Sequence, residues 1–162
     1  MIEYDNIDWL NYININYEVQ SYTFYNNKKI KNIKLPNYIK GIAEYAFTYS
    51  NIETIILPET IEKIGSFAFY GCKNLKRIEI PKSIDIIKFD AFDNSGIEYI
   101  TFEKINYLNI NLFSKCENLK TIKVKKGRYI FSCPKIYNES INKIICEDII
   151  LIRTKNNEWR LI

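Results

Sequence analysis

Residues able to support catalysis are few in this chain of 162 residues. It contains no histidine, which removes the commonest general base, the nucleophile pairs that depend on histidine, and most zinc sites. The four cysteines form no C-x-x-C pair, and the five glycines are scattered rather than gathered in a phosphate-binding loop. The acidic residues lie mainly between apolar positions, where solvated charges belong. We therefore predict no enzymatic activity, no metal and no cofactor.

The cysteines are better explained by packing than by redox chemistry. Cys72 and Cys116 occupy one position of a sequence repeat, two repeats apart, and serine fills the sister positions. Stacked repeats would hold these two cysteines roughly 10 Å apart, beyond the limit of about 7 Å between the Cα atoms of a disulfide. Cys146 falls at a core position and Cys133 could approach it, but we favour reduced thiols throughout.

Basic residues gather between positions 115 and 128, where Glu117 is the one acidic residue. Such a cluster can bind nucleic acid, another polyanion or an acidic protein. The candidate polyanion site consists of Lys120, Lys123, Lys125, Lys126 and Arg128. Lysines near a sheet edge also block edge-to-edge pairing, and we favour this structural explanation. Residues 1–27 are acidic and contain no Lys or Arg, so the two ends could also associate head to tail.

A repeat of 22 or 23 residues positions all of these side chains. The segments 52–58 and 75–81 share the pattern apolar-x-x-apolar-x-apolar-Pro. Repeats with this character begin at Ile30, Ile52, Leu75, Ile97, Leu119 and Ile141. A period of this length is typical of a solenoid, in which one coil cannot bury its apolar face alone and the stacking of coils makes the core.

Each coil is expected to begin with a short β-strand, because apolar and polar residues alternate there with a bias toward β-branched side chains. Pro36, Pro58 and Pro81 would end these strands, since proline donates no hydrogen bond to a neighbouring strand. Coils stacked in register would form one parallel sheet with a rise of about 4.8 Å per coil. The predicted fold is a β-rich solenoid with short parallel strands and 22 or 23 residues per coil.

The second half of each coil also repeats and ends in the pattern apolar-x-x-x-small-Phe. This predicts a tight corner that admits one ring, supplied in turn by Phe47, Phe69, Phe92 and Phe113. Two residues earlier lies another column of aromatic side chains, which is replaced by polar residues further along. Its members are Tyr22, Tyr45 and Phe67, followed by Asp90 and Asn111. We expect these rings to seal the core, with a second binding face as the less favoured alternative.

The repeats indicate a single domain that spans residues 1–162 and is capped at both ends. Residues 1–29 would form an N-terminal cap and a decayed coil, and residues 30–118 four regular coils. Residues 119–162 would form a further decayed coil and a C-terminal hairpin. Trp9 and Trp159 lie one in each end segment, as large side chains that cover an open core would.

The string from Ile52 to Cys72 resembles one repeat of the BspA-like, or Treponema pallidum-type, leucine-rich repeat family. It contains Leu-Pro at 57–58, Ile-x-x-Ile-Gly at 61–65, Ala-Phe at 68–69 and Gly-Cys at 71–72. The resemblance covers residues 30–118 well and the ends poorly, and the coil that begins at Ile97 lacks the apolar-Pro step. It implies a leucine-rich-repeat fold and a binding role, often in surface antigens and adhesins, and no catalytic activity.

The outward positions of the expected strands form the main candidate binding surface. The candidate partner-binding residues are Lys34, Thr54, Ile56, Arg77, Glu79, Tyr99, Thr101, Thr121 and Lys123. Ile56 and Tyr99 are informative, because large apolar groups on a solvated face often anchor a partner, although both residues also simply suit a strand. We predict a non-catalytic protein–protein interaction module, such as an adhesin or an effector. Polyanion binding and a self-associating structural unit are the alternatives.

The chain has no run of about 18 apolar residues, so we expect no membrane insertion. The segment 1–5 is acidic and lacks the basic and apolar regions of a signal peptide. We expect an intracellular location if Met1 is the native start, and a cell-surface or secreted one if it is not. We also expect a monomer or weak self-association, with a protein partner whose identity the sequence does not name.

Overall fold

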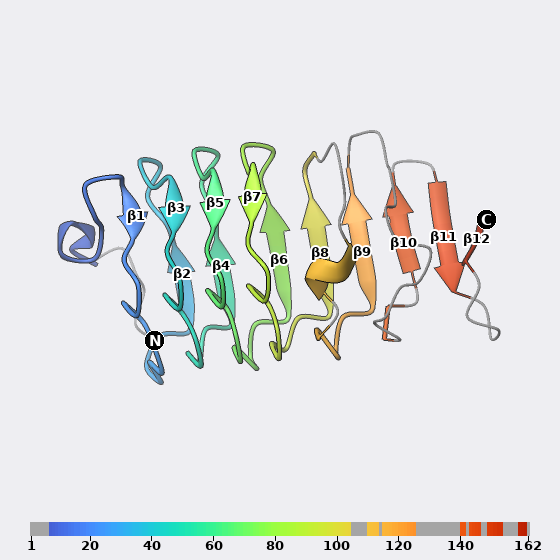
Figure 1. Cartoon of the computed structure of the whole chain (residues 1–162), viewed down its shortest axis with the longest axis horizontal. Coiled ribbons are helices and arrows are strands. Elements are labelled where there is room, and N and C mark those ends of the chain that lie inside the picture. Colours follow the sequence, from blue (N-terminus) through green and yellow to red (C-terminus); the bar gives the residue numbers. More distant parts are fainter. Residues whose placement is uncertain are drawn as a thin grey trace.

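The computed structural model describes residues 7–104, 110–113, 115–125, 140–141, 143–146, 149–153 and 159–161. These residues form a parallel β-solenoid of the kind the repeat predicts, with coils stacked along the long axis of the molecule (Figure 1). We number the coils from their first residues: coil 1 begins at Ile30, coil 2 at Ile52, coil 3 at Leu75 and coil 4 at Ile97. Residues 7–29 are called the N-terminal coil.

The first half of each coil contributes one strand to the strand face, which is the outward side of these strands. The strands are β2 (Asn32–Lys34), β4 (Thr54–Ile56), β6 (Arg77–Ile80), β8 (Tyr99–Phe102), β9 (Thr121–Val124) and β10 (Lys143–Cys146). β2 pairs with β4, and β6, β8, β9 and β10 pair in that order, all in parallel. Paired residues on this face are 22 apart, as Asn32 and Thr54 are.

The prediction of a single sheet is wrong in one respect, because the strands fall into two hydrogen-bonded groups. β2 and β4 form a two-stranded sheet, and β6 begins a separate six-stranded one. The division falls where Ile55 of β4 is followed 23 residues later by Ile78 of β6, at the coil with one extra residue. β4 and β6 remain neighbours, so the outward columns of side chains continue across the division.

A second parallel sheet lies on another side of the coils, and the sequence did not predict it. Its strands are β1 (Glu18–Val19), β3 (Gly41–Ile42), β5 (Lys63–Ile64) and β7 (Ile86–Ile87), joined in that order. Each has two residues, which is too short for an alternating pattern to be recognised. β3, β5 and β7 run alongside β2, β4 and β6 (Figure 1), and buried residues of both sets of strands belong to one apolar core.

The end segments depart from the parallel pattern. β11 (Ile149–Arg153) pairs antiparallel with β10, and β12 (Trp159–Leu161) pairs antiparallel with β11. Among the described residues, short 3₁₀ helices lie at η2 (Trp9–Asn11) and η3 (Ile110–Phe113). In the part of the chain that the structure describes, no helix is long and apolar enough to span a membrane.

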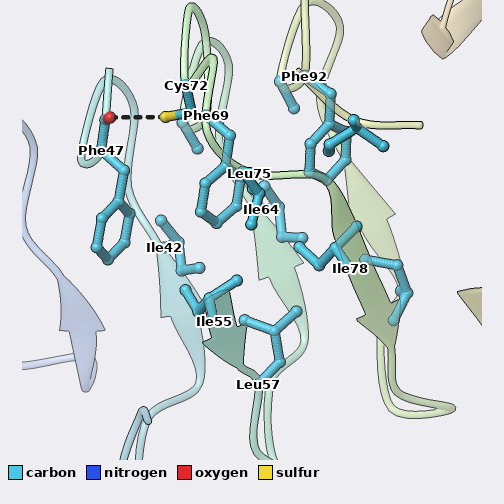
Figure 2. Close-up of a cluster of buried hydrophobic side chains, with 14 of the residues drawn as sticks. Ile42, Phe47, Ile55, Leu57, Ile64, Phe69, Cys72, Leu75, Ile78 and Phe92 are labelled. Atoms are coloured by element: carbon cyan, nitrogen blue, oxygen red, sulfur yellow. Dashed lines mark hydrogen bonds between the residues drawn. The ribbon is translucent and has the colours of Figure 1, made fainter. Parts of the chain in front are cut away.

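The core is a column of phenylalanine rings flanked by isoleucine and leucine (Figure 2). Phe47 stacks on Phe69 with centroids 5.3 Å apart, and Phe69 on Phe92 at 5.4 Å. All three side chains are fully buried, as is the small residue that precedes each of them. The first residue of every coil is also buried. The predicted corner that admits a single ring is therefore present.

The described cysteines are packing residues, as expected, and they also donate hydrogen bonds between coils. The thiol of Cys72 donates to the carbonyl of Phe47 at 3.0 Å (Figure 2), and Cys116 donates to Phe92 at 3.2 Å. Burial raises the pKa of Cys72 to about 11 and that of Cys116 to about 12. Both thiols stay protonated and unreactive near neutral pH. Cys133 and the Cys146 side chain lie outside the described residues.

The aromatic column that was expected to seal the core stacks as expected, but it lies at the edge of the core rather than within it. Tyr22, Tyr45 and Phe67 have left-handed backbone φ angles of 61°, 59° and 57°. Tyr22 is 57% exposed, whereas Tyr45 and Phe67 are half-buried. The core is closed by the phenylalanines two residues later. Left-handed conformations are uncommon for such residues, so the repeat alone does not reveal them.

Candidate functional site

The strand face is a regular surface with an open hollow over its middle strands. Side chains alternate between buried and solvent-facing along β2, β4, β6, β8 and β9, as the sequence predicted. The hollow has a volume of about 590 Å³ and lies over β4, β6, β8 and β9. Seven of the nine candidate partner-binding residues line it: Thr54, Arg77, Glu79, Tyr99, Thr101, Thr121 and Lys123.

The two remaining candidates, Lys34 and Ile56, do not line the hollow but extend the same face. Both end their strands and are exposed. Ile56 is 58% exposed, which leaves a large apolar group in water beside the hollow. Lys125, which the sequence assigned to the candidate polyanion site alone, also lines this hollow and follows β9 directly.

Arg77 and Tyr99 form the best-defined contact on this face. They are register partners on β6 and β8, and the guanidinium carbon of Arg77 lies 4.6 Å from the centre of the Tyr99 ring. A guanidinium over an aromatic ring is held by a cation–π attraction. The contact fixes two long side chains in advance, which lowers the entropy cost of using them to bind a partner.

Lys125 connects the acidic residues at one side of the hollow. Its ammonium forms ion pairs with the carboxylates of Glu79 and Glu103. The hydrogen bond from Lys125 lowers the pKa of Glu103, and the same contacts raise the pKa of Lys125. Lys125 and Glu103 therefore remain charged at neutral pH. Lys34 and Lys123 make no ion pair with another described residue, so the face keeps free cations as well.

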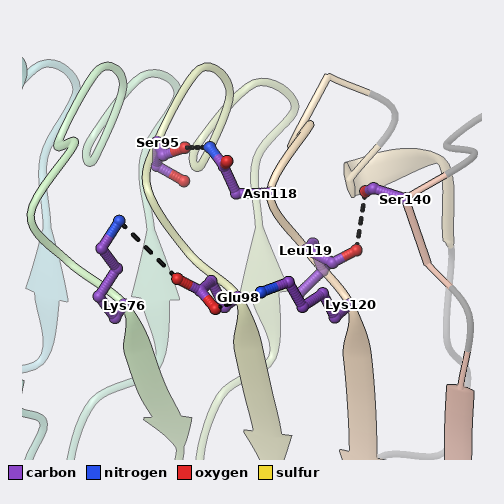
Figure 3. Close-up of polar contacts among 7 residues, drawn as sticks. All are labelled: Lys76, Ser95, Glu98, Asn118, Leu119, Lys120 and Ser140. Carbon is purple, nitrogen blue, oxygen red and sulfur yellow. Dashed lines mark hydrogen bonds and ion pairs between the residues drawn. The ribbon is translucent and has the colours of Figure 1, made fainter.

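Some lysines of the candidate polyanion site are already paired with carboxylates of this chain. Lys120 donates to Glu98 at 2.7 Å, and Lys76 lies 3.9 Å from the same carboxylate (Figure 3). The hydrogen bond to Lys120 lowers the pKa of Glu98. Lys125 is engaged by two carboxylates, as described above. Lys126 and Arg128 lie outside the described residues.

Side-chain amides and hydroxyls tie one coil to the next near these ion pairs. Asn118 donates to the carbonyl of Ser95 at 3.1 Å, and Ser140 donates to that of Leu119 at 2.7 Å (Figure 3). Asn51 makes the same kind of bond to Lys28 in the preceding coil. These bonds satisfy backbone carbonyls between neighbouring coils.

A second hollow, of about 820 Å³, lies at the corner of the coils, along the aromatic column that the sequence offered as the less favoured second binding face. It is lined by tyrosines, by Phe67, and by a group of charged residues in coils 3 and 4. It shares no lining residue with the strand-face hollow. The signal that could have found it is the abrupt change from aromatic to acidic residues in one repeat column.

The described side chains include neither a metal-ligating cluster nor an exposed thiol. Among them, no three His, Cys, Asp or Glu side chains come together in a way that could hold a metal ion. The described thiols are buried and protonated. The arrangement can therefore hold a partner through shape, apolar contact and fixed charge.

The family comparison agrees with the repeat. A model of the BspA type leucine-rich repeat region, with six copies, matches residues 3–120 and 40–155. A crystal structure of a leucine-rich repeat protein from Eubacterium ventriosum ATCC 27560 is similar, with a TM-score of 0.59 and 20% identity. The match covers 90% of this chain and 51% of that one, so this chain spans about half its length.

None of the curated proteins compared with the chain matches it. The likeness to the Eubacterium protein concerns the fold. The family model extends over most of the residues and over all of the regular coils. Coils of this kind are generally non-catalytic binding modules. The chain belongs to the BspA-type leucine-rich repeat family.

Proposed function

We propose that the chain is a non-catalytic interaction module that holds a partner protein against its strand face. The observation that carries this proposal is the Arg77–Tyr99 pair, fixed at 4.6 Å on the wall of an open hollow. Tyrosine and arginine are enriched among the residues that dominate binding energy at protein interfaces. Here both are held in place by paired strands before any partner arrives.

The chemistry of the face suits a partner with mixed polar and apolar contacts. Ile56 supplies an exposed apolar contact at one side, and Lys123 supplies an unpaired cation at the other. Thr101 and Thr121 add hydroxyl groups between them. A partner that presents an apolar side chain to Ile56 and a carboxylate to Arg77 or Lys123 would match this arrangement.

The size of the face limits the strength of binding. Five or six strands span about 25 Å and a five-residue strand about 17 Å, which gives roughly 400 Å². A standard interface needs about 800 Å² from each partner. One copy is therefore expected to bind weakly, and several copies would raise the apparent affinity through effective concentration.

The test compares two double variants in affinity capture from the source cell or its host, with bound proteins quantified by mass spectrometry. Ile56→Glu/Tyr99→Ala alters the strand face. Ile86→Glu/Tyr38→Ala makes the same two changes at exposed positions away from it, with Ile86 47% and Tyr38 44% exposed. Both variants are first checked for folding by circular dichroism.

We expect the first variant to lose the proteins that wild type captures and the second to keep them. Equal capture by both variants would place the contact surface elsewhere. Loss of capture by both would show that binding depends on general surface character rather than on the strand face.

A further inference from the structure

Six aromatic rings form a continuous floor at the corner of the coils, which we call the tyrosine groove. The rings belong to Tyr22, Tyr25, Tyr45, Tyr49, Phe67 and Tyr70. In one row Tyr22 stacks on Tyr45 and Tyr45 on Phe67, each at 5.1 Å and within 10° of parallel. In the other row the rings of Tyr25, Tyr49 and Tyr70 meet edge to face.

The two rows are joined at both ends. Tyr22 contacts Tyr25 and Phe67 contacts Tyr70, each at 5.7 Å, so the six rings enclose one surface. Tyr22, Tyr25 and Tyr49 are 57%, 47% and 41% exposed. A group of large rings held together in water is unusual for a soluble surface without a partner.

The backbone is built to display these rings. Tyr22, Tyr45, Tyr49 and Phe67 all have φ between 57° and 61°, a conformation that costs L-residues about 1 kcal/mol or more each. Gly71 also has positive φ, and a Cβ there would lie 2.4 Å from the Tyr49 ring. The missing side chain of Gly71 is what leaves room for Tyr49.

The aromatic floor ends abruptly at coil 3, where two columns change together. Asp90 continues the column of Tyr45 and Phe67, and Asp93 continues the column of Tyr70. Asp90 keeps the left-handed conformation of its column, with φ of 63°. The same corner geometry therefore presents rings in three coils and carboxylates in the next.

A lysine of this chain already occupies the acidic end. The ammonium of Lys115 lies 3.3 Å from Asp90 and 3.1 Å from Asp93, while its side chain is 68% exposed. The lining contains three acids, Asp90, Asp93 and Glu117, against Lys115 alone. Burial raises the pKa of Asp93, so Asp90 and Glu117 supply the accessible negative charge. The groove therefore remains complementary to a cation even with Lys115 in place.

We propose that the tyrosine groove binds an extended, proline-containing peptide that carries arginine or lysine. The prolines lie on the rings, and a cationic side chain reaches Asp90 and Glu117 beside the Phe67 and Tyr70 rings. Aromatic-lined grooves hold proline-rich segments because the polyproline II helix is formed before binding. Aromatic faces also attract guanidinium and ammonium groups.

The spacing of the coils fits this kind of peptide. A polyproline II helix advances about 9.3 Å per turn of three residues, and two coils advance about 9.6 Å. Tyr25 and Tyr70 hold equivalent positions two coils apart. A peptide that runs along the stack would therefore present equivalent residues to both rings. None of these residues belongs to the strand face, so the proposal is independent of the partner proposed above.

The probe is a fluorescent peptide of three Arg-Pro-Pro units, whose arginines share one face of the polyproline II helix, measured by fluorescence anisotropy with the full chain. Three Glu-Pro-Pro units test charge, and three Arg-Gly-Gly units test the preformed helix. An unlabelled neutral oligosaccharide tests whether the rings bind sugar instead. We expect the Arg-Pro-Pro peptide to bind, the other two peptides to bind at least about fivefold more weakly, and the oligosaccharide not to compete.

Four variants locate the contact. Asp90→Asn and Tyr25→Ala/Tyr70→Ala should each weaken binding by about threefold or more. Lys115→Gln should tighten it, because it removes the ammonium that competes for Asp90 and Asp93. Ile56→Glu/Tyr99→Ala on the strand face should leave it unchanged. Circular dichroism melting confirms that each variant is folded.

Three results would overturn the proposal. The first is no binding of the Arg-Pro-Pro peptide by wild type at about 1 mM, a limit that covers weak single-site contacts. The second is equal binding of the arginine and glutamate peptides. The third is displacement of the peptide by the oligosaccharide together with an unchanged affinity in Asp90→Asn, which would assign the rings to a glycan.

Discussion

The strand face and the tyrosine groove lie on the same coils but are built by opposite means. Residues on the strand face lie on extended backbone, and paired strands fix the register of Arg77 against Tyr99. In the groove, Tyr45 and Phe67 stand on left-handed corners whose backbone is strained. A repeat can therefore build one surface from its regular elements and another from the exceptions within its turns.

The comparison also shows where each surface draws its stability. Both depend on the phenylalanine column, whose rings stack at 5.3 and 5.4 Å between coils. The strand face adds the hydrogen bonds of its paired strands. The groove adds contacts between rings at the surface, which are offset by the cost of a left-handed backbone. Changes in the core should damage both surfaces, and changes at the corners should damage the groove alone.

The largest expected effect is a difference in stability between variants of Phe67 and Phe69, which are two residues apart. Phe69→Ala should lower the free energy of unfolding by about 3–5 kcal/mol, because it empties a fully buried site. Phe67→Ala should cost less, about 1–2 kcal/mol, since its ring is half-buried and packs on Tyr45 and Tyr70 at the edge of the core. Urea unfolding followed by circular dichroism measures both. Similar losses of unfolding free energy in the two variants would show that the Phe67 ring belongs to the core.

The second prediction concerns alkaline pH and reports on the shared core. Burial raises the pKa of Cys72 to about 11 and that of Cys116 to about 12, above the ordinary value of 9.0. Above pH 9 the unfolded thiols lose protons that the folded thiols keep, so stability falls as the pH rises. The loss should approach about 1.4 kcal/mol per pH unit for each thiol.

Urea titrations from pH 8 to 11 measure this slope. Tyrosines also ionise in that range, so the double variant Cys72→Ser/Cys116→Ser serves as the reference. Serine keeps a donor for the carbonyls of Phe47 and Phe92 and does not titrate. A variant with the same slope as wild type would show that the thiols are not the cause.

The third prediction concerns a substitution that should disturb the groove and leave the strand face unchanged. Gly71→Ala places a methyl group 2.4 Å from the Tyr49 ring and keeps the backbone at φ of 67°. We expect a loss of about 1 kcal/mol and a shift of the tyrosine signals in near-ultraviolet circular dichroism. Capture of a strand-face partner should be unchanged. If the variant captures less partner and its tyrosine circular dichroism signal also changes, the two surfaces are coupled.

The smallest expected effect is at the rim of the strand face. Lys125→Ala removes the ion pairs with Glu79 and Glu103, which are exposed to solvent and contribute little to stability. Thermal unfolding should therefore be nearly unchanged. Because the variant leaves two carboxylates unpaired beside the hollow, partner binding should gain a dependence on salt. A large loss of stability would contradict the description of this network as a surface feature.

The strand face was predictable because its signal is repeated and local. Apolar residues such as Ile33, Ile55 and Ile78 recur at fixed spacing, and the residues between them must then face outward. Six recurrences exclude an accidental pattern. The same regularity located the phenylalanine corner and the small side chains beside it.

The sequence offered the groove only as a less favoured second face, because the signal that decides it is conformational. A column that contains Tyr45 and Phe67 matches a buried aromatic column equally well, and only the left-handed backbone turns it outward. The two-residue strands such as Gly41–Ile42 were missed because alternation needs more residues. The contact between Arg77 and Tyr99 depends on side-chain conformation, which a repeat does not specify.

The central claim is that partner contact belongs to the strand face. The most direct measurement is quantitative capture by the matched variants Ile56→Glu/Tyr99→Ala and Ile86→Glu/Tyr38→Ala, with wild type as reference. Loss of captured partner in the first variant and retention in the second is the predicted result. Full retention of partner by the first variant, folded as wild type, would contradict the account.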